Sequence, residues 1–229
     1  MAKKIFPKVD VPLQKRSKNI TLKEELLKLD LESLLVKQEI KFGALIEKIK
    51  SCQDCQRNLL DKNAVPILDF SKKIISDYSP LVFFVGDFPR HGEQKGCFLE
   101  AQHELLLNMI KAMRLEKDEY YLSLVFKCAP CSPLSIDEML KNCAAHIEQE
   151  INQLRPKVVI SLGALATCSL LKQKKRLAEV HGQFLTIDTG LENPFHLVPL
   201  FHPEYLLINP KMKQTAWNDM KKVMNFIGR

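Results

Sequence analysis

The chain has 229 residues, 46% of them hydrophobic and 27% charged, so it is long enough for one sizeable α/β domain with an appendage. Lysine and arginine number 34 against 27 acidic residues, and the formal charge of +7 favours a polyanionic partner, nucleic acid before membrane. No hydrophobic run has the length of a membrane span and the amino end lacks an apolar signal core, so we expect a cytoplasmic protein without a membrane partner.

The first fifty residues differ in composition from the rest, and we expect residues 1–50 to form a basic, flexible and helical extension of a domain over 51–229. Residues 1–20 are rich in lysine, proline and polar groups without periodicity, which is typical of a flexible arm. Thr21 and Glu24 then match a capping box, and leucines follow at mixed helical spacing up to Leu35, which predicts one or two amphipathic helices between about residues 22 and 51. A lysine-rich helix of this kind either lies on nucleic acid or presents a solvated face.

Four apolar segments are typical of buried β-strands, at residues 80–86, 120–126, 156–163 and 197–201. Helical patterns lie between and after them, at residues 102–113, 135–153, 164–171 and 211–226. Strands that alternate with helices predict a three-layer α/β/α sandwich around a central parallel sheet of about four strands. Pro199 lacks a backbone donor, so we place its strand at an edge of the sheet.

Cysteines in a cytosolic chain indicate metal ligation or buried thiols and not a disulfide framework. Cys52 and Cys55 form a Cys-x-x-Cys pair, Cys128 follows the second strand, and Cys143 lies on the next helix. Four thiolates fit either tetrahedral zinc or an iron–sulfur cluster, and we assign no histidine ligand. Cys131 makes a second pair with Cys128, so spacing alone favours zinc on the two pairs; the simpler alternative is that only the first pair binds an ion.

Polar residues follow the carboxyl ends of two predicted strands, where open α/β sheets bind their ligands. Asp87 follows Gly86 and either orients a water or stabilises a cation, or else caps a turn. His202 is suited to donate a hydrogen bond to a developing anion. The alternative is that its hydrogen bonds are satisfied within the protein, at a strand end before a turn fixed by Pro203. Phe98 lies in the loop after Asp87 and is either a stacking platform for a flat ligand or part of the core.

The order of these features resembles one family, the iron–sulfur uracil-DNA glycosylases of the family 4 type, over roughly residues 50–228. The motifs that carry the resemblance are Phe-Val-Gly at 84–86, Val-x-Lys-Cys at 125–128, Arg-Pro-Lys-Val-Val-Ile-Ser-Leu-Gly-Ala at 155–164, and His-Pro-Glu-Tyr-Leu-Leu-Ile-Asn-Pro at 202–210. The resemblance implies a uracil-DNA glycosylase-like fold and a [4Fe–4S] cluster. The ligands it implies, in place of the zinc set, are Cys52, Cys55, Cys128 and Cys143.

The resemblance also implies an enzyme that acts on DNA containing a damaged base, uracil by default, in base excision repair; we expect it to be a monomer. The nucleotide would leave the stack, and the N-glycosidic bond would be hydrolysed. Asp87 would position water or stabilise the oxocarbenium-like sugar, and His202 would hydrogen-bond the departing base, while the loop after it presses into the DNA groove. Phe98 would stack on the base, and the other substrate-binding positions are Gly86, Leu124 and Gly163.

Several positions depart from the family pattern, among them Arg90, which stands where the family has Gly, and Ser132-Pro133-Leu134, which replaces a Pro-Asn-Arg loop. Asp87 stands where the family usually has Glu, and Leu124 stands where it has the Asn that reads uracil. A leucine offers no polar partner to a base edge, and a buried polar edge without a partner costs about 1–3 kcal/mol. Two alternatives therefore accompany the uracil assignment: a catalytically weakened iron–sulfur protein that binds nucleic acid, and a glycosylase for another deaminated base.

Overall fold

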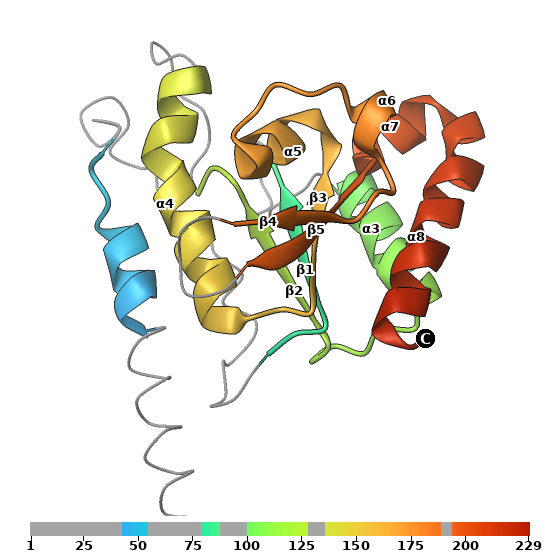
Figure 1. The fold of residues 1–229 in the computed structure, drawn as a ribbon, viewed down its shortest axis with the longest axis horizontal. Coiled ribbons are helices and arrows are strands. Elements are labelled where there is room, and N and C mark those ends of the chain that lie inside the picture. Colours follow the sequence, from blue (N-terminus) through green and yellow to red (C-terminus); the bar gives the residue numbers. More distant parts are fainter. Residues whose placement is uncertain (1–42, 55–78, 88–99, 128–135, 189–193) are drawn as a thin grey trace, which may run out of the picture.

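A computed structural model describes residues 43–54, 79–87, 100–127, 136–188 and 194–229 of the chain. Its strands are β1 (Val82–Gly86), β2 (Tyr120–Leu124), β3 (Val158–Leu162), β4 (Leu185–Ile187) and β5 (Phe195–Leu200). Its helices are α3 (Glu100–Ala112), α4 (Ile136–Leu154), α5 (Gly163–Leu171), α6 (Leu177–Val180), α7 (Pro203–Ile208) and α8 (Lys213–Ile227), with a 3-10 turn η1 (Pro210–Met212). Figure 1 shows the sheet at the centre with helices on both sides.

The sheet has five strands in the order β2-β1-β3-β5-β4, and the first four are parallel. The predicted α/β fold is therefore confirmed, with four parallel strands where about four were expected. The fifth strand, β4, pairs antiparallel with β5 and was not predicted. It has three residues and none of them is fully buried, so it lacks the apolar run that marks the other strands.

The prediction that the Pro199 strand lies at an edge is wrong, because β5 pairs with β3 on one side and β4 on the other. The last β4–β5 pair joins Leu185 to Leu197, so β4 has left the ladder before Pro199. A residue's N–H and C=O point to the same side of a strand, and the Pro199 carbonyl accepts from the Gly182 N–H at 2.8 Å. The missing N–H of Pro199 therefore faces a turn and costs the sheet no ladder bond.

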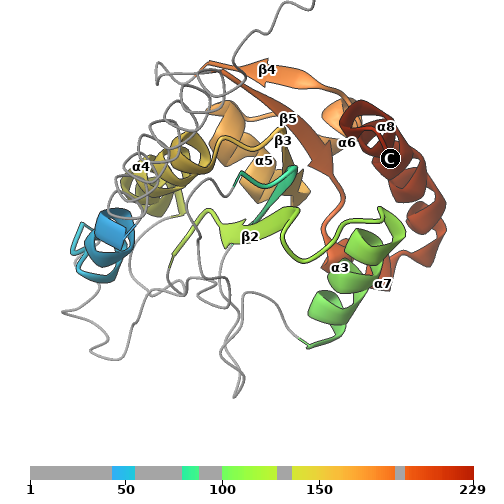
Figure 2. The ribbon, with the colours of Figure 1, turned by 90° about the horizontal axis from the view of Figure 1, so that it is seen from below.

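Two apolar cores cover the two faces of the sheet. Successive residues of β1 alternate between them, as expected for a strand buried on both sides: Val82 and Phe84 pack with α3, α7 and α8, and Phe83 and Val85 pack with α4 and α5. Figures 1 and 2 show these two groups of helices on opposite sides of the sheet. No helix among the described residues is long and apolar enough to cross a membrane.

A helical segment over residues 43–50 lies beside α4 in both views, within the range predicted to be helical. Its Leu45 and Ile49 are buried in the same core as Ile147 and Ile151 of α4. The segment therefore extends the helical layer on that face, and it leads directly into Cys52. The expected flexible arm and the capping box at Thr21 lie outside the described residues.

Candidate active site and metal centre

The carboxyl ends of β1 and β5 bring Asp87 and His202 together. Each residue follows its strand by one or two positions, and both strands pair with β3 in parallel, so both residues lie at one edge of the sheet. The Nε2 atom of His202 is 3.8 Å from Oδ1 of Asp87. The side chains of His202 and Asp87 are only 9% and 16% exposed, respectively, so an interaction between them takes place in surroundings less polar than water.

The helix that follows His202 fixes the orientation of its ring. His202 is the N-cap of α7, with Pro203 at the first helical position, and its Nδ1 accepts a hydrogen bond of 3.2 Å from the Glu204 backbone N–H. A ring nitrogen that accepts carries no proton, so in the neutral imidazole the proton lies on Nε2. Nε2 is the nitrogen nearer Asp87, and this side of the ring is therefore a hydrogen-bond donor.

Gly163 lets His202 approach the start of α5 closely. The φ angle of Gly163 is +90°, in the left-handed region that favours glycine, and an added Cβ would lie 3.1 Å from the Cβ of His202. A side chain at this position would therefore push the imidazole away. Gly163 contributes space to the site and no functional group.

The backbone after β1 is held by the continuation of β2. The N–H groups of Val125 and Phe126 donate to the carbonyl oxygens of Gly86 and Asp87, both at 3.0 Å. Leu124 pairs with Gly86 across this ladder. The Leu124 side chain is 1% exposed and belongs to the apolar core on the α3 face. Position 124 therefore lies beside the site and has an apolar environment.

Several predicted site residues lie outside the described residues: Phe98, Cys55, Cys128 and the alternative ligand Cys131. Cys52 and Cys143 are described. Cys143 is buried on α4 and packs against Phe126, which precedes Cys128 by two positions in the chain. Of the two predicted ligands that the structure describes, Cys143 therefore packs beside the residues that follow β2.

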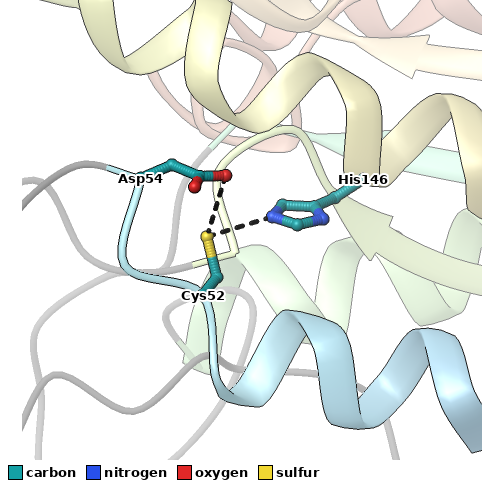
Figure 3. Close-up of side chains that lie close together, drawn as sticks. All are labelled: Cys52, Asp54 and His146. Atoms are coloured by element: carbon teal, nitrogen blue, oxygen red, sulfur yellow. Dashed lines mark hydrogen bonds between the residues drawn. The ribbon is translucent and has the colours of Figure 1, made fainter.

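Cys52 lies in a polar cluster with Asp54 and His146, shown in Figure 3. Its Sγ is 3.2 Å from Nε2 of His146 and 3.4 Å from Oδ2 of Asp54. Their ligand atoms all lie within 4.8 Å of one another, which is a spacing that can hold a metal ion. The Asn142 side chain donates to the Asp54 carbonyl at 3.1 Å and so ties this segment to α4.

His146 was not predicted from the sequence as a site residue. Desolvation by burial is the main cause that lowers its pKa from the usual 6.5, with the Lys127 charge adding to the effect, so the neutral ring is favoured. A signal was present in the sequence, because Cys143-Ala-Ala-His146 is a Cys-x-x-His pattern on a predicted helix. Residues three apart on a helix lie on one face, so the two side chains are directed to the same side of α4.

A buried ion pair joins the residues after β2 to α4, the helix that carries Cys143 and His146. The Nζ of Lys127 is 2.8 Å from Oε1 of Glu150 on α4, and both side chains are almost fully buried. Lys127 also donates to the Leu124 carbonyl at 2.8 Å and to the Ser123 hydroxyl at 2.7 Å, and that hydroxyl donates to Glu150 at 2.6 Å. The network ties the end of β2 to α4.

Comparison with known proteins agrees with the α/β fold described above. The model of the Uracil DNA glycosylase superfamily matches residues 73–221, and the chain belongs to this superfamily.

Within the superfamily the chain is similar to proteins named Type-4 uracil-DNA glycosylase. The protein of Sulfurisphaera tokodaii is 28% identical over 190 residues, covering 78% of this chain and 83% of the relative. That of Archaeoglobus fulgidus is 24% identical over 194 residues, covering 81% and 92%. That of Thermotoga maritima is 25% identical over 187 residues, covering 79% and 92%.

Proposed function

We propose that this chain is a DNA glycosylase that hydrolyses the N-glycosidic bond of a flipped-out damaged base, uracil by default, in base excision repair. The observation that carries the proposal is the pair of Asp87 and His202, 3.8 Å apart at the carboxyl edge of the sheet. The relatives named Type-4 uracil-DNA glycosylase support the same reaction class. We further propose that the protein acts as a monomer in the cytoplasm.

The proposed reaction needs a donor for the leaving base and a negative charge near the sugar. As the bond between C1′ and the base nitrogen breaks, its electron pair moves to the base and negative charge develops on a base carbonyl oxygen. The Nε2–H of His202 donates to that oxygen, in the tautomer that the Glu204 N–H selects. The Asp87 carboxylate stabilises the positive sugar and orients a water, which adds at C1′; the water's proton passes through the carboxylate to the departing base anion, so that the products are the free base and a sugar hydroxyl.

The surface of α7 supports DNA as the partner. This helix begins directly after His202 and exposes three large apolar side chains, Tyr205 at 42%, Leu207 at 40% and Ile208 at 72%. Apolar side chains that enter a base step unstack it, which lowers the cost of extruding a nucleotide. The net charge of +7 favours binding to phosphates.

We propose that Cys52, Cys55, Cys128 and Cys143 hold a [4Fe–4S] cluster. The described residues suit it: Cys143 is buried, it packs against Phe126 near Cys128, and Cys52 is in contact with the same helix through His146. Thiolates are the usual ligands of iron–sulfur clusters. When bound, the cluster would supply a rigid link between the Cys52 segment, the end of β2 and α4.

A second candidate function is supported by Leu124. It stands where the family has an Asn that hydrogen-bonds uracil, and its apolar side chain is packed in the core. Sites that select a base by hydrogen bonds lose much of their discrimination when the partner is missing. The protein would then bind nucleic acid with weak or no excision, or would excise another deaminated base.

The test is excision of uracil from single- and double-stranded oligonucleotides, read as strand cleavage after alkali. We expect activity in the natural protein and a loss of about 10²–10⁴-fold in Asp87→Ala and in His202→Ala, the usual contribution of a general acid or base. His196→Ala is the matched control, because His196 is an exposed histidine on β5, the strand that leads to His202.

Equal activity in all four proteins would contradict the assigned roles. If no protein cleaves uracil DNA but all bind it, the same assay with hypoxanthine and xanthine decides between the two alternatives. Excision of either base identifies a glycosylase of changed specificity, and binding without excision identifies the non-catalytic protein.

A further inference from the structure

The contact between His146 and Cys52 joins a buried imidazole to a proposed ligand of the cluster. His146 is 3% exposed and its Nε2 lies 3.2 Å from the Cys52 sulfur, although the two residues are 94 positions apart. His146 lies one helical turn after Cys143, a second proposed ligand, and both are buried on α4. A hydrogen bond to sulfur is longer than one to oxygen, so 3.2 Å is a close contact.

The Cys52 sulfur makes a second polar contact, and this hydrogen bond is lost when the sulfur binds iron. As a thiol, Cys52 donates its proton to the Asp54 carboxylate at 3.4 Å. A thiolate has no proton to give, and two negative groups repel each other, so this contact loses its attraction when the sulfur binds iron. The imidazole contact gains strength, because a thiolate is a better acceptor for Nε2–H.

We propose that His146 donates an N–H···S hydrogen bond to the Cys52 thiolate and thereby raises the reduction potential of the cluster. The inference rests on the proposed [4Fe–4S] site and adds a positioning residue to it. In the neutral ring only one nitrogen carries the proton, and a thiolate neighbour selects the Nε2–H tautomer. Reduction adds negative charge to the cluster and its sulfurs, so a donor to sulfur stabilises the reduced form more than the oxidised form.

The experiment measures the midpoint potential by spectroelectrochemical titration of three proteins with determined iron content. His146→Leu removes the donor, and His146→Gln keeps an N–H at similar reach. In His146→Leu we expect the ratio of reduced to oxidised cluster at a fixed potential to fall about tenfold, a shift of about 59 mV to more negative potential for one electron. In His146→Gln we expect at least half of that shift to be restored.

Asn142→Ala is the matched control. It removes the amide that holds the Asp54 carbonyl, so it loosens the same segment while the proposed donor, His146, is kept. A potential that shifts equally in Asn142→Ala and His146→Leu would overturn the proposal, because segment position alone would then explain the effect. If leucine prevents cluster assembly, His146→Phe provides a second donor-free protein of nearly the same volume.

The remaining outcomes separate this inference from the proposal it rests on. Natural protein without iron overturns the cluster and the inference together. Iron-loaded protein whose potential is unchanged in His146→Leu overturns the inference alone. Loss of iron in His146→Leu and His146→Phe, with iron retained in His146→Gln, supports the inference. Loss of iron in all three of these variants overturns the donor role. Uracil excision is measured separately and decides neither question.

Discussion

Glycine is required at position 163 for two reasons that can be separated. The backbone there has a φ of +90°, and the space that a Cβ would occupy lies 3.1 Å from the Cβ of His202. The first reason concerns the stability of the fold, because an L-residue in this conformation costs about 1–3 kcal/mol. The second concerns the position of the proposed donor, because small displacements of a reacting group reduce catalysis strongly.

Gly163→Ala is therefore expected to lower both the stability and the turnover of the protein. We expect a loss of about 1–3 kcal/mol in the free energy of unfolding and a decrease of about tenfold or more in kcat. Urea unfolding and single-turnover excision of uracil measure the two effects. Gly228→Ala is the control, because Gly228 has a similar φ of +87° with nothing within 4 Å of its added Cβ. A kcat that falls equally in both variants would contradict the role in positioning His202.

At the scale of secondary structure, the end of β2 is attached to α4 by the ion pair between Lys127 and Glu150. The two side chains are 2% and 1% exposed, so neither charge is solvated if the other is removed. Such pairs contribute little compared with an apolar pair of the same volume, but breaking one by removing a single partner is costly. Lys127 also donates to the Leu124 carbonyl, and in the chain it directly precedes Cys128, a proposed ligand of the cluster.

Lys127→Met is expected to lower the free energy of unfolding by about 3–5 kcal/mol, because it leaves the Glu150 carboxylate buried beside the Ser123 hydroxyl alone. The double variant Lys127→Met/Glu150→Met should recover most of this loss. A double-mutant cycle by urea unfolding, at matched iron content, measures the coupling. The comparison pair is Lys172 with Glu148, also on α4, whose lysine is 57% exposed; Lys172→Met should cost at most about 1 kcal/mol. Additive effects at Lys127 and Glu150 would contradict the argument.

For the whole molecule, the proposed cluster acts as a cross-link between distant parts of the chain. Cys52 follows the helical segment over residues 43–50, and Cys143 lies on α4, so the link closes a loop of 143 − 52 = 91 residues. In the chain-entropy model, closing a loop of this size stabilises the fold by about 4.6 kcal/mol. Binding that occurs only in the folded state adds to the stability of that state.

Removing the cluster by oxidation and chelation is therefore expected to lower Tm by about 9–18 °C, at about 2–4 °C per kcal/mol for a chain of this length. Cys52→Ser should lower iron content and Tm in the same way. Cys168→Ser is the control, because Cys168 is not among the proposed ligands and its thiol donates to the Lys175 carbonyl. Differential scanning calorimetry with iron analysis measures both quantities, and an unchanged Tm after iron removal would contradict the cross-link.

The sequence predicted the fold well because the four parallel strands are apolar runs that end at glycine, proline or a charge. It also predicted that residues after β1 and β5 share one sheet edge, which follows from parallel strands alone. It did not predict β4, whose three residues are only partly buried. Nor did it predict the His146 contact or the burial of Lys127, because both depend on how α4 packs, and charged side chains in a sequence are usually solvated.

Asp87 and His202 are separated by 202 − 87 = 115 positions, and the strands before them do not pair with each other but with β3 between them. During synthesis the amino-terminal part of a chain emerges first. A nascent chain that has exposed β1, β2 and β3 still lacks the histidine, and a chain arrested before β5 has an incomplete site. Under the proposed function, incomplete translation products therefore lack the donor for the leaving base and are not expected to excise bases.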